Sequence, residues 1–165
     1  MNRPSIITWR PATTYILIIS TVVLLIGLVL AYMFTTFTPS TPVRIGSGVY
    51  HLRIADTEAE LKQGLSGVSA LKGDGGLLMD FGSDNYWGIW MKDMKIPLDI
   101  VWLDKNKQVI YIVKNAGPEL STDVTFFPKT KARYVLELQA GSVEKAGIKT
   151  GMIASFDEHD KGELW

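Results

Sequence analysis

An uncharged, apolar run near the N-terminus divides this 165-residue chain into two parts. No charged residue occurs between Arg10 and Arg44, and the stretch from Tyr15 to Phe34 is almost wholly apolar. Twenty helical residues span about 30 Å, which is the thickness of the hydrocarbon core of a bilayer. The run therefore predicts a transmembrane helix at residues 14–34, and the membrane is the first partner that we expect.

The charges that flank this run predict its orientation. Arg3, Arg10 and the free amino group make the N-terminal side positive, so residues 1–13 are expected in the cytoplasm and the C-terminal domain outside. A cleaved signal peptide is the alternative. The apolar run is longer than the usual signal core, and the residues around Ala31 form no clear A-x-A cleavage signal. We therefore expect a single-pass protein of the cell membrane.

Composition limits what the rest of the chain can do. Residues 35–42 are rich in Thr and Pro and predict an extended linker, followed by a domain at 43–157 and a polar tail at 158–165. After position 40 there are 15 basic and 17 acidic residues, a net charge of −2 that gives no general attraction to nucleic acid. The chain has no cysteine, and His51 and His159 lie in no ligand-spaced cluster. We expect no metal ion, no cofactor and no nucleic-acid partner.

The domain shows the short-period alternation that is typical of β-strands. Apolar and polar residues alternate in 49–55 and 133–138, and 100–103 with 109–113 form the clearest hairpin pattern. Thr57 and Glu60 match a capping box at a helix start, and Ser142 is expected to cap a second short helix. Residues 76–81, 88–91 and 152–156 also predict strands. The fold class is therefore mainly β: a compact sandwich or barrel of about seven short strands with two short helices.

Residues 87–99 combine tryptophans, lysines and aspartates, and they are the best place to look for function. A polar corner at 92–95 is expected between two strands, the second of which begins at Asp99. A tryptophan face beside charged groups is what a glycan- or peptide-binding groove requires. If the strands of Asp99 and Glu137 are neighbours, we expect their carboxylates to flank Lys92 or Arg133 and to form either a structural ion-pair network or the floor of a polar pocket. The predicted binding residues are Trp87, Trp90, Lys92, Asp99, Arg133 and Glu137.

The order of segments resembles the prokaryotic family called domain of unknown function 192 over roughly residues 43–156. The resemblance rests on the sequence segments GL at 64–65, GLLMDF at 76–81, WMK at 90–92, IPLD at 96–99, AGP at 116–118 and ARYVLEL at 132–138. It implies a compact, mainly β domain that is often exported or membrane-tethered, and it brings no agreed substrate or catalytic residue. The sequence departs from the family pattern at Gln63, Ser66, Asp93 and Met94.

Three functions are compatible with these patterns. The leading hypothesis is an outward-facing domain that binds a cell-envelope ligand, either a glycan or a peptide, or a partner protein. The second is an envelope hydrolase in which Asp99 and Glu137 act as an acid and base pair, which requires their carboxyl groups within about 10 Å of each other. The third is a purely structural envelope protein.

Overall fold

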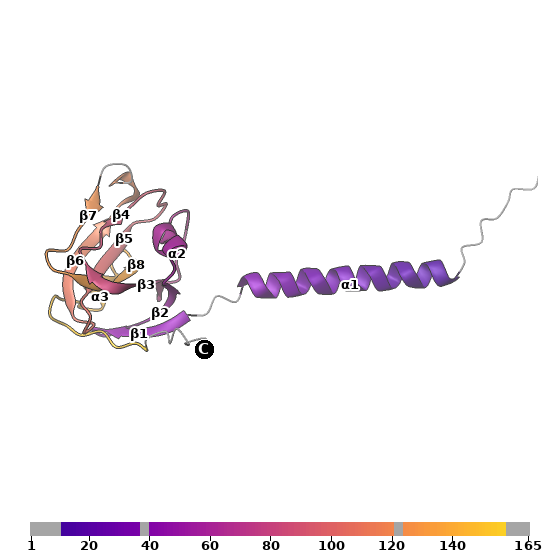
Figure 1. Ribbon diagram of the computed structural model, residues 1–165, viewed down its shortest axis with the longest axis horizontal. Coiled ribbons are helices and arrows are strands. Elements are labelled where there is room, and N and C mark those ends of the chain that lie inside the picture. The colour runs from indigo at the N-terminus through magenta and orange to yellow at the C-terminus, as the bar shows by residue number, and fades with distance from the viewer. Residues whose placement is uncertain (1–10, 37–39, 121–123, 158–165) are drawn as a thin grey trace, which may run out of the picture. The chain divides into compact units, whose positions relative to one another are not determined.

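The computed structural model describes residues 11–36, 40–120 and 124–157 (Figure 1). The chain forms two compact units, Met1–Thr38 and Pro39–Trp165. Helix α1 (Pro11–Thr36) belongs to the first unit. Within the described part of the chain, no helix is both long and apolar enough to cross a membrane, so the predicted transmembrane helix is not confirmed. Residues 1–10 of the predicted cytoplasmic segment, and the predicted tail at 158–165, lie outside the described residues.

The second unit is built on a six-stranded sheet with the order β1-β2-β3-β8-β5-β6. Its strands are β1 (Ser40–Ile45), β2 (Gly48–Ala55), β3 (Gly75–Asn85), β5 (Leu98–Leu103), β6 (Val109–Ala116) and β8 (Ala132–Gln139). Neighbouring strands are antiparallel except β2 and β3, which run parallel and are connected through helix α2 (Glu58–Gln63). The mainly β fold with short helices is confirmed.

The predicted linker ends earlier than the sequence suggested. Strand β1 begins at Ser40 and pairs with β2 from the Ser40–Arg53 position onward, so residues 40–42 belong to the sheet. Pro42 is tolerated there because β1 is a terminal strand of the sheet, where a missing N–H breaks no second ladder.

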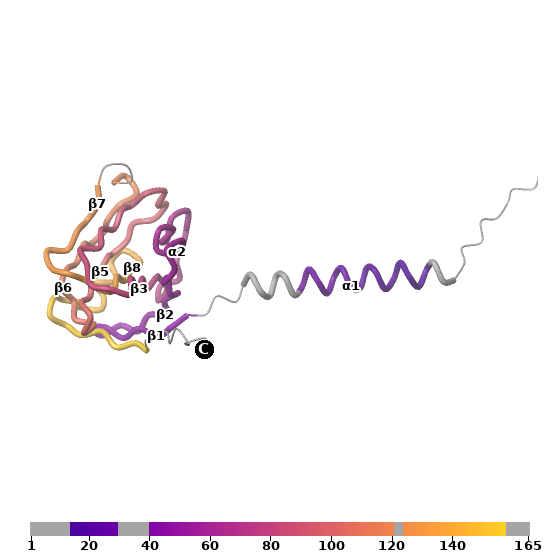
Figure 2. Tube along the Cα trace, viewed as in Figure 1, coloured from indigo at the N-terminus to yellow at the C-terminus, as the bar shows by residue number. Residues whose placement is uncertain are grey.

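The C-terminal segment connects the two outer strands of the sheet. Arg44 of β1 exchanges two backbone hydrogen bonds of 2.8 Å with Ser155, and the N–H of Val109 in β6 donates to the carbonyl of Met152 at 2.8 Å. Figure 2 shows this yellow segment passing close to β1 and β6. The strand predicted at 152–156 is therefore reduced to isolated bridges, because the segment crosses from one edge to the other.

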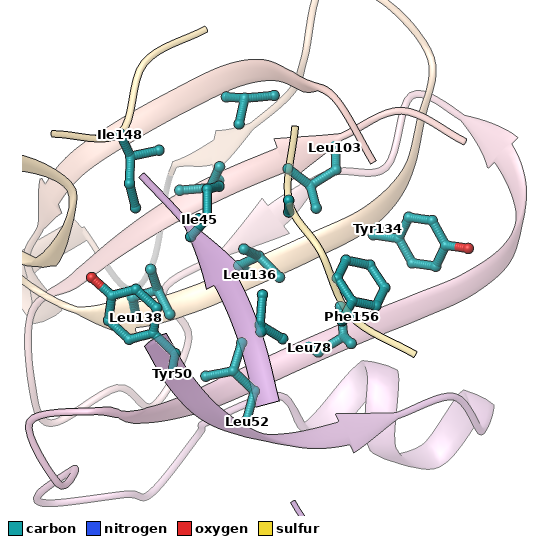
Figure 3. Close-up of a cluster of buried hydrophobic side chains, with 14 of the residues drawn as sticks. Ile45, Tyr50, Leu52, Leu78, Leu103, Tyr134, Leu136, Leu138, Ile148 and Phe156 are labelled. Carbon is teal, nitrogen blue, oxygen red and sulfur yellow. The ribbon is translucent and has the colours of Figure 1, made fainter. Parts of the chain in front are cut away.

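Two hydrophobic cores lie on the two faces of the sheet. The core in Figure 3 includes Val43, Leu52, Leu78, Val101, Leu136 and Leu138. The core on the other face includes Leu77, Met79, Ile100, Trp102 and Val135. Consecutive residues of one strand contribute to different cores, as the period of two requires. All six residues of β5 are buried, so this strand is covered on both faces.

Two predictions of local structure are confirmed, and one is wrong. The capping box of Thr57 and Glu60 is present in both directions, and the β5–β6 hairpin is formed. The predicted cap at Ser142 is wrong, because Gly141 takes the N-cap position with φ of 87° and Ser142 begins α3 (Ser142–Lys145). The remaining elements are β4 (Ile89–Trp90), which pairs with β7 (Thr125–Phe126), and the 3₁₀ helix η1 (Pro118–Leu120).

Candidate functional site

A cavity of about 420 Å³ lies between α2, the segment 87–94 and the sheet. Its walls are largely apolar. They include Leu61, Leu65, Met79, Phe81, Ile89 and Met94. Trp87 and Trp90 line the same cavity, and so does Glu137 of β8. A hollow with apolar walls and a few polar groups is the usual form of a ligand site, so we call this cavity the pocket.

The turn that follows α2 forms one side of the pocket. The helix ends at Gly64, whose φ of 52° suits glycine, and whose N–H donates to the carbonyl of Glu60. Two hydrogen bonds then attach this turn to the segment on the opposite side. The hydroxyl of Ser66 donates to the carbonyl of Lys92 at 2.8 Å, and the N–H of Gly67 donates to the carbonyl of Asp93 at 2.9 Å. These bonds fix the width of the pocket at this end.

The two tryptophans differ in how firmly they are held. Trp87 stacks on Phe81 with ring centroids 4.4 Å apart, and its indole N–H donates to the carbonyl of Ser83. The indole N–H of Trp102 donates to the carbonyl of Trp87 at 2.8 Å, which fixes the backbone there. Trp90 is 45% exposed, and the Nζ atom of Lys92 lies 5.9 Å from its ring centroid. Trp87 is therefore a fixed wall, and Trp90 offers a free aromatic surface.

Glu137 is the buried acidic group of the pocket lining, and it is only 4% exposed. Its Oε2 atom has no hydrogen-bond partner among the described residues. Burial raises the pKa of Glu137 to about 7, against the opposing effects of the Arg53 charge and of the Leu65 backbone N–H, which donates to the carboxylate. Arg53 itself donates to the carbonyl of Gly64 at 3.2 Å. The pocket thus holds a carboxylate whose hydrogen-bonding capacity is only partly used.

Comparison with known proteins gives the family. Residues 41–156 match the family model DUF192, which is described as an uncharacterised ACR. The chain belongs to the DUF192 family. No curated protein matches the DUF192 chain.

Two solved structures share the fold of this DUF192 domain. A proposed transcription regulator from Sinorhizobium meliloti 1021 superposes with a TM-score of 0.64 and 27% identity, covering 70% of this chain and 91% of the other. A protein of unknown function from Novosphingobium aromaticivorans DSM 12444 gives a TM-score of 0.64 and 26% identity, covering 70% of this chain and 83% of the other.

Asp99 of the DUF192 domain does not reach the pocket. The β5–β8 register pairs Asp99 with Leu138 and Ile100 with Glu137, so the two carboxylates point to opposite faces of the sheet. Asp99 is buried and accepts the backbone N–H groups of Asn115 at 2.9 Å and Val143 at 2.8 Å. The predicted adjacency of the two strands is confirmed. The acid and base pair of the hydrolase hypothesis is not formed.

Arg133 is also outside the pocket of the DUF192 domain. Its Nε atom lies 3.5 Å from Oδ1 of Asp80, and its guanidinium lies 5.4 Å from the ring centroid of Tyr134. Arg133 therefore links β8 to β3, and it lies four residues from Glu137 along β8. The predicted partnership of Arg133 with Glu137 is not present.

Lys92 lies at a second hollow, of about 460 Å³, that shares Trp90 with the pocket. Reasoning from the sequence missed several residues that line the two hollows, namely Glu58, Leu61, Lys62, Gln63, Ser66, Asp93 and Met94. The sequence carried a signal for four of these residues. The four departures from the family resemblance, at Gln63, Ser66, Asp93 and Met94, all fall in these linings. Among the described residues, no group of three or more potential ligands could hold a metal ion.

Proposed function

We propose that this DUF192 domain binds a peptide segment of a cell-envelope partner in the pocket beside Trp90. The observation that carries the proposal is the combination of apolar walls with the exposed Trp90 ring in one cavity. Exposed aromatic rings next to apolar cavities are favoured anchoring points because they bury a large area at small conformational cost.

The chemistry of the walls favours a peptide over a glycan. A sugar ring carries hydroxyl groups around its edge, and each buried hydroxyl requires a hydrogen-bond partner. The apolar part of the pocket lining consists of Leu, Met, Ile, Phe and Trp side chains. Their hydrogen-bond donors are the two indole N–H groups, and that of Trp87 already donates to the carbonyl of Ser83. Peptide side chains with apolar stems match such walls better.

Amide chemical-shift mapping of the full-length protein tests the proposal. Short peptides and glycan oligomers are added separately, and we expect peptide-induced shifts in residues 61–66 and 87–94. Trp90→Ala should weaken binding, whereas Ile153→Ala, which removes an exposed apolar side chain that lines neither hollow, should not. If no peptide shifts these residues, or if both variants behave alike, the proposed function is wrong.

We further propose that residues 14–34 anchor the domain to the cell membrane with the domain outside. The proposal is supported by the uncharged run between Arg10 and Arg44 and by the exposure of large apolar side chains along α1, such as Leu24 at 62%. The absence of cysteine allows a direct test. Lys149→Cys should react with a membrane-impermeant maleimide on intact cells, and Asn2→Cys only after lysis. The reverse labelling pattern, or recovery of the protein without membranes, would contradict the anchor.

The regulator role given to the Sinorhizobium meliloti protein is a weaker candidate for this chain. A net charge of −2 after position 40 provides no electrostatic attraction to DNA. Mobility-shift assays with genomic DNA fragments at low salt should therefore show no binding.

A further inference from the structure

The carboxylate of Glu137 in the pocket lining indicates which peptide side chain the pocket accepts. A buried polar atom without a partner costs free energy, and the cost is larger for a group that can carry charge. Oε2 of Glu137 is such an atom, whereas the Leu65 N–H already binds this carboxylate. A ligand that donates a hydrogen bond to Oε2 would remove this cost.

A cationic donor suits the position better than a neutral donor does. Hydrogen bonds between a cation and a carboxylate are shorter and about twice as strong as those between neutral groups. The nearest protein cation, Arg53, is directed elsewhere: Nη2 donates to the carbonyl of Gly64, and Nη1 lies 3.9 Å from Oε1 of Glu60. At the pocket rim, Glu58 and Lys62 carry opposite charges, so the rim favours neither a positive nor a negative ligand.

The apolar walls add a second requirement, because the group that reaches Glu137 must pass between them. Leu61, Leu65 and Met94 line the pocket together with the two tryptophans. A side chain with a flexible methylene stem can bury that stem along such walls and carry a charged end. Lysine has this form: four methylene groups and a compact ammonium group with three donors.

We propose that the pocket is a lysine-binding pocket, in which the methylene stem of a partner's lysine packs between Leu65 and the tryptophans and its ammonium group donates to the carboxylate of Glu137. This assignment rests on the proposed peptide-binding function and names the side chain that the pocket selects.

The test uses four blocked tripeptides, acetyl-Gly-X-Gly-amide, in which X is lysine, norleucine, ε-acetyllysine or glutamate. Norleucine is the matched control, because it keeps a four-carbon stem and lacks the ammonium group. Binding to the full-length protein is followed at pH 8 through the Leu65 amide signal and the indole N–H signals. We expect the lysine peptide to bind at least about tenfold more tightly than the norleucine and ε-acetyllysine peptides, and the glutamate peptide to bind most weakly.

Glu137→Gln should remove the preference for lysine, so that the lysine peptide binds no more tightly than the norleucine peptide. Glu144→Gln, a substitution at an exposed glutamate of α3, should keep the preference. Thermal unfolding verifies that each variant is folded. Equal affinities for the lysine and norleucine peptides in the wild type would overturn the lysine assignment alone. Failure of all four peptides to bind would overturn the peptide-binding function together with it.

Discussion

Replacing Glu137 by glutamine is expected to stabilise the protein at alkaline pH, and the effect follows from its raised pKa. The folded-state pKa of about 7 lies above the ordinary value of 4.5, so the folded protein binds this proton more tightly than the unfolded chain does. The stabilisation that the Glu137 carboxyl group contributes is therefore fully present below about pH 4.5, and it is lost as the pH rises to about 7. Each pH unit inside this window costs about 1.4 kcal/mol, so the wild type loses about 3 kcal/mol in total.

Chemical denaturation of the full-length protein at pH 5, 6, 7 and 8, followed by tryptophan fluorescence, measures this loss. Relative to Glu137→Gln, the wild type should become less stable by about 2–3 kcal/mol between pH 5 and pH 8. Glu144→Gln serves as the control for the removal of one negative charge from the surface. A stability difference between the wild type and Glu137→Gln that stays constant over this pH range would refute the argument. If the wild type instead became more stable relative to Glu137→Gln as the pH rises, the pocket would stabilise the ionised carboxylate.

Three further substitutions, together with Gly73→Ala as a control, test the structure by the same denaturation assay. Asp99→Ala should destabilise the fold by about 3–5 kcal/mol, because two buried backbone N–H groups lose a charged acceptor; a loss below 1 kcal/mol would contradict this role. Gly76→Ala should cost at least about 1–3 kcal/mol, since its Cβ would overlap the backbone carbonyl oxygen of Glu137, whereas Gly73→Ala has open space and should change stability by less than about 1 kcal/mol. Thr57→Ala should cost about 1 kcal/mol through loss of the capping box, and an unchanged midpoint would show that the cap is not needed.

Part of the candidate site could be predicted from the sequence because it is carried by one continuous segment. Trp87 and Trp90 were recognised from their unusual neighbourhood, and both line the pocket. The other side of the pocket comes from the turn after α2, about 25 residues earlier in the chain, and the signal at its Ser66 was a departure from the family pattern. Hydrogen bonds from Ser66 and Gly67 to the 92–93 backbone bring these two segments together. Nothing in the local pattern of either segment specifies that pairing.

The sequence by itself determined most strands of the large sheet, the capped helix and the hairpin, because these depend on alternation, turn residues and caps that act over a few neighbours. It also determined that Arg133 and Glu137 share one face of their strand. Only the tertiary structure decided the register of each strand against its neighbour, and therefore which of their side chains lie on the same face of the sheet. Asp99 pairs with Leu138 and not with Glu137, and this offset of one residue places the two carboxylates on opposite sides of the sheet. Side-chain direction alternates with every residue along a strand, so a difference of one residue in register moves a side chain to the other face of the sheet. Asp99 is therefore a buried acceptor of backbone hydrogen bonds, whereas Glu137 is a carboxylate of the pocket.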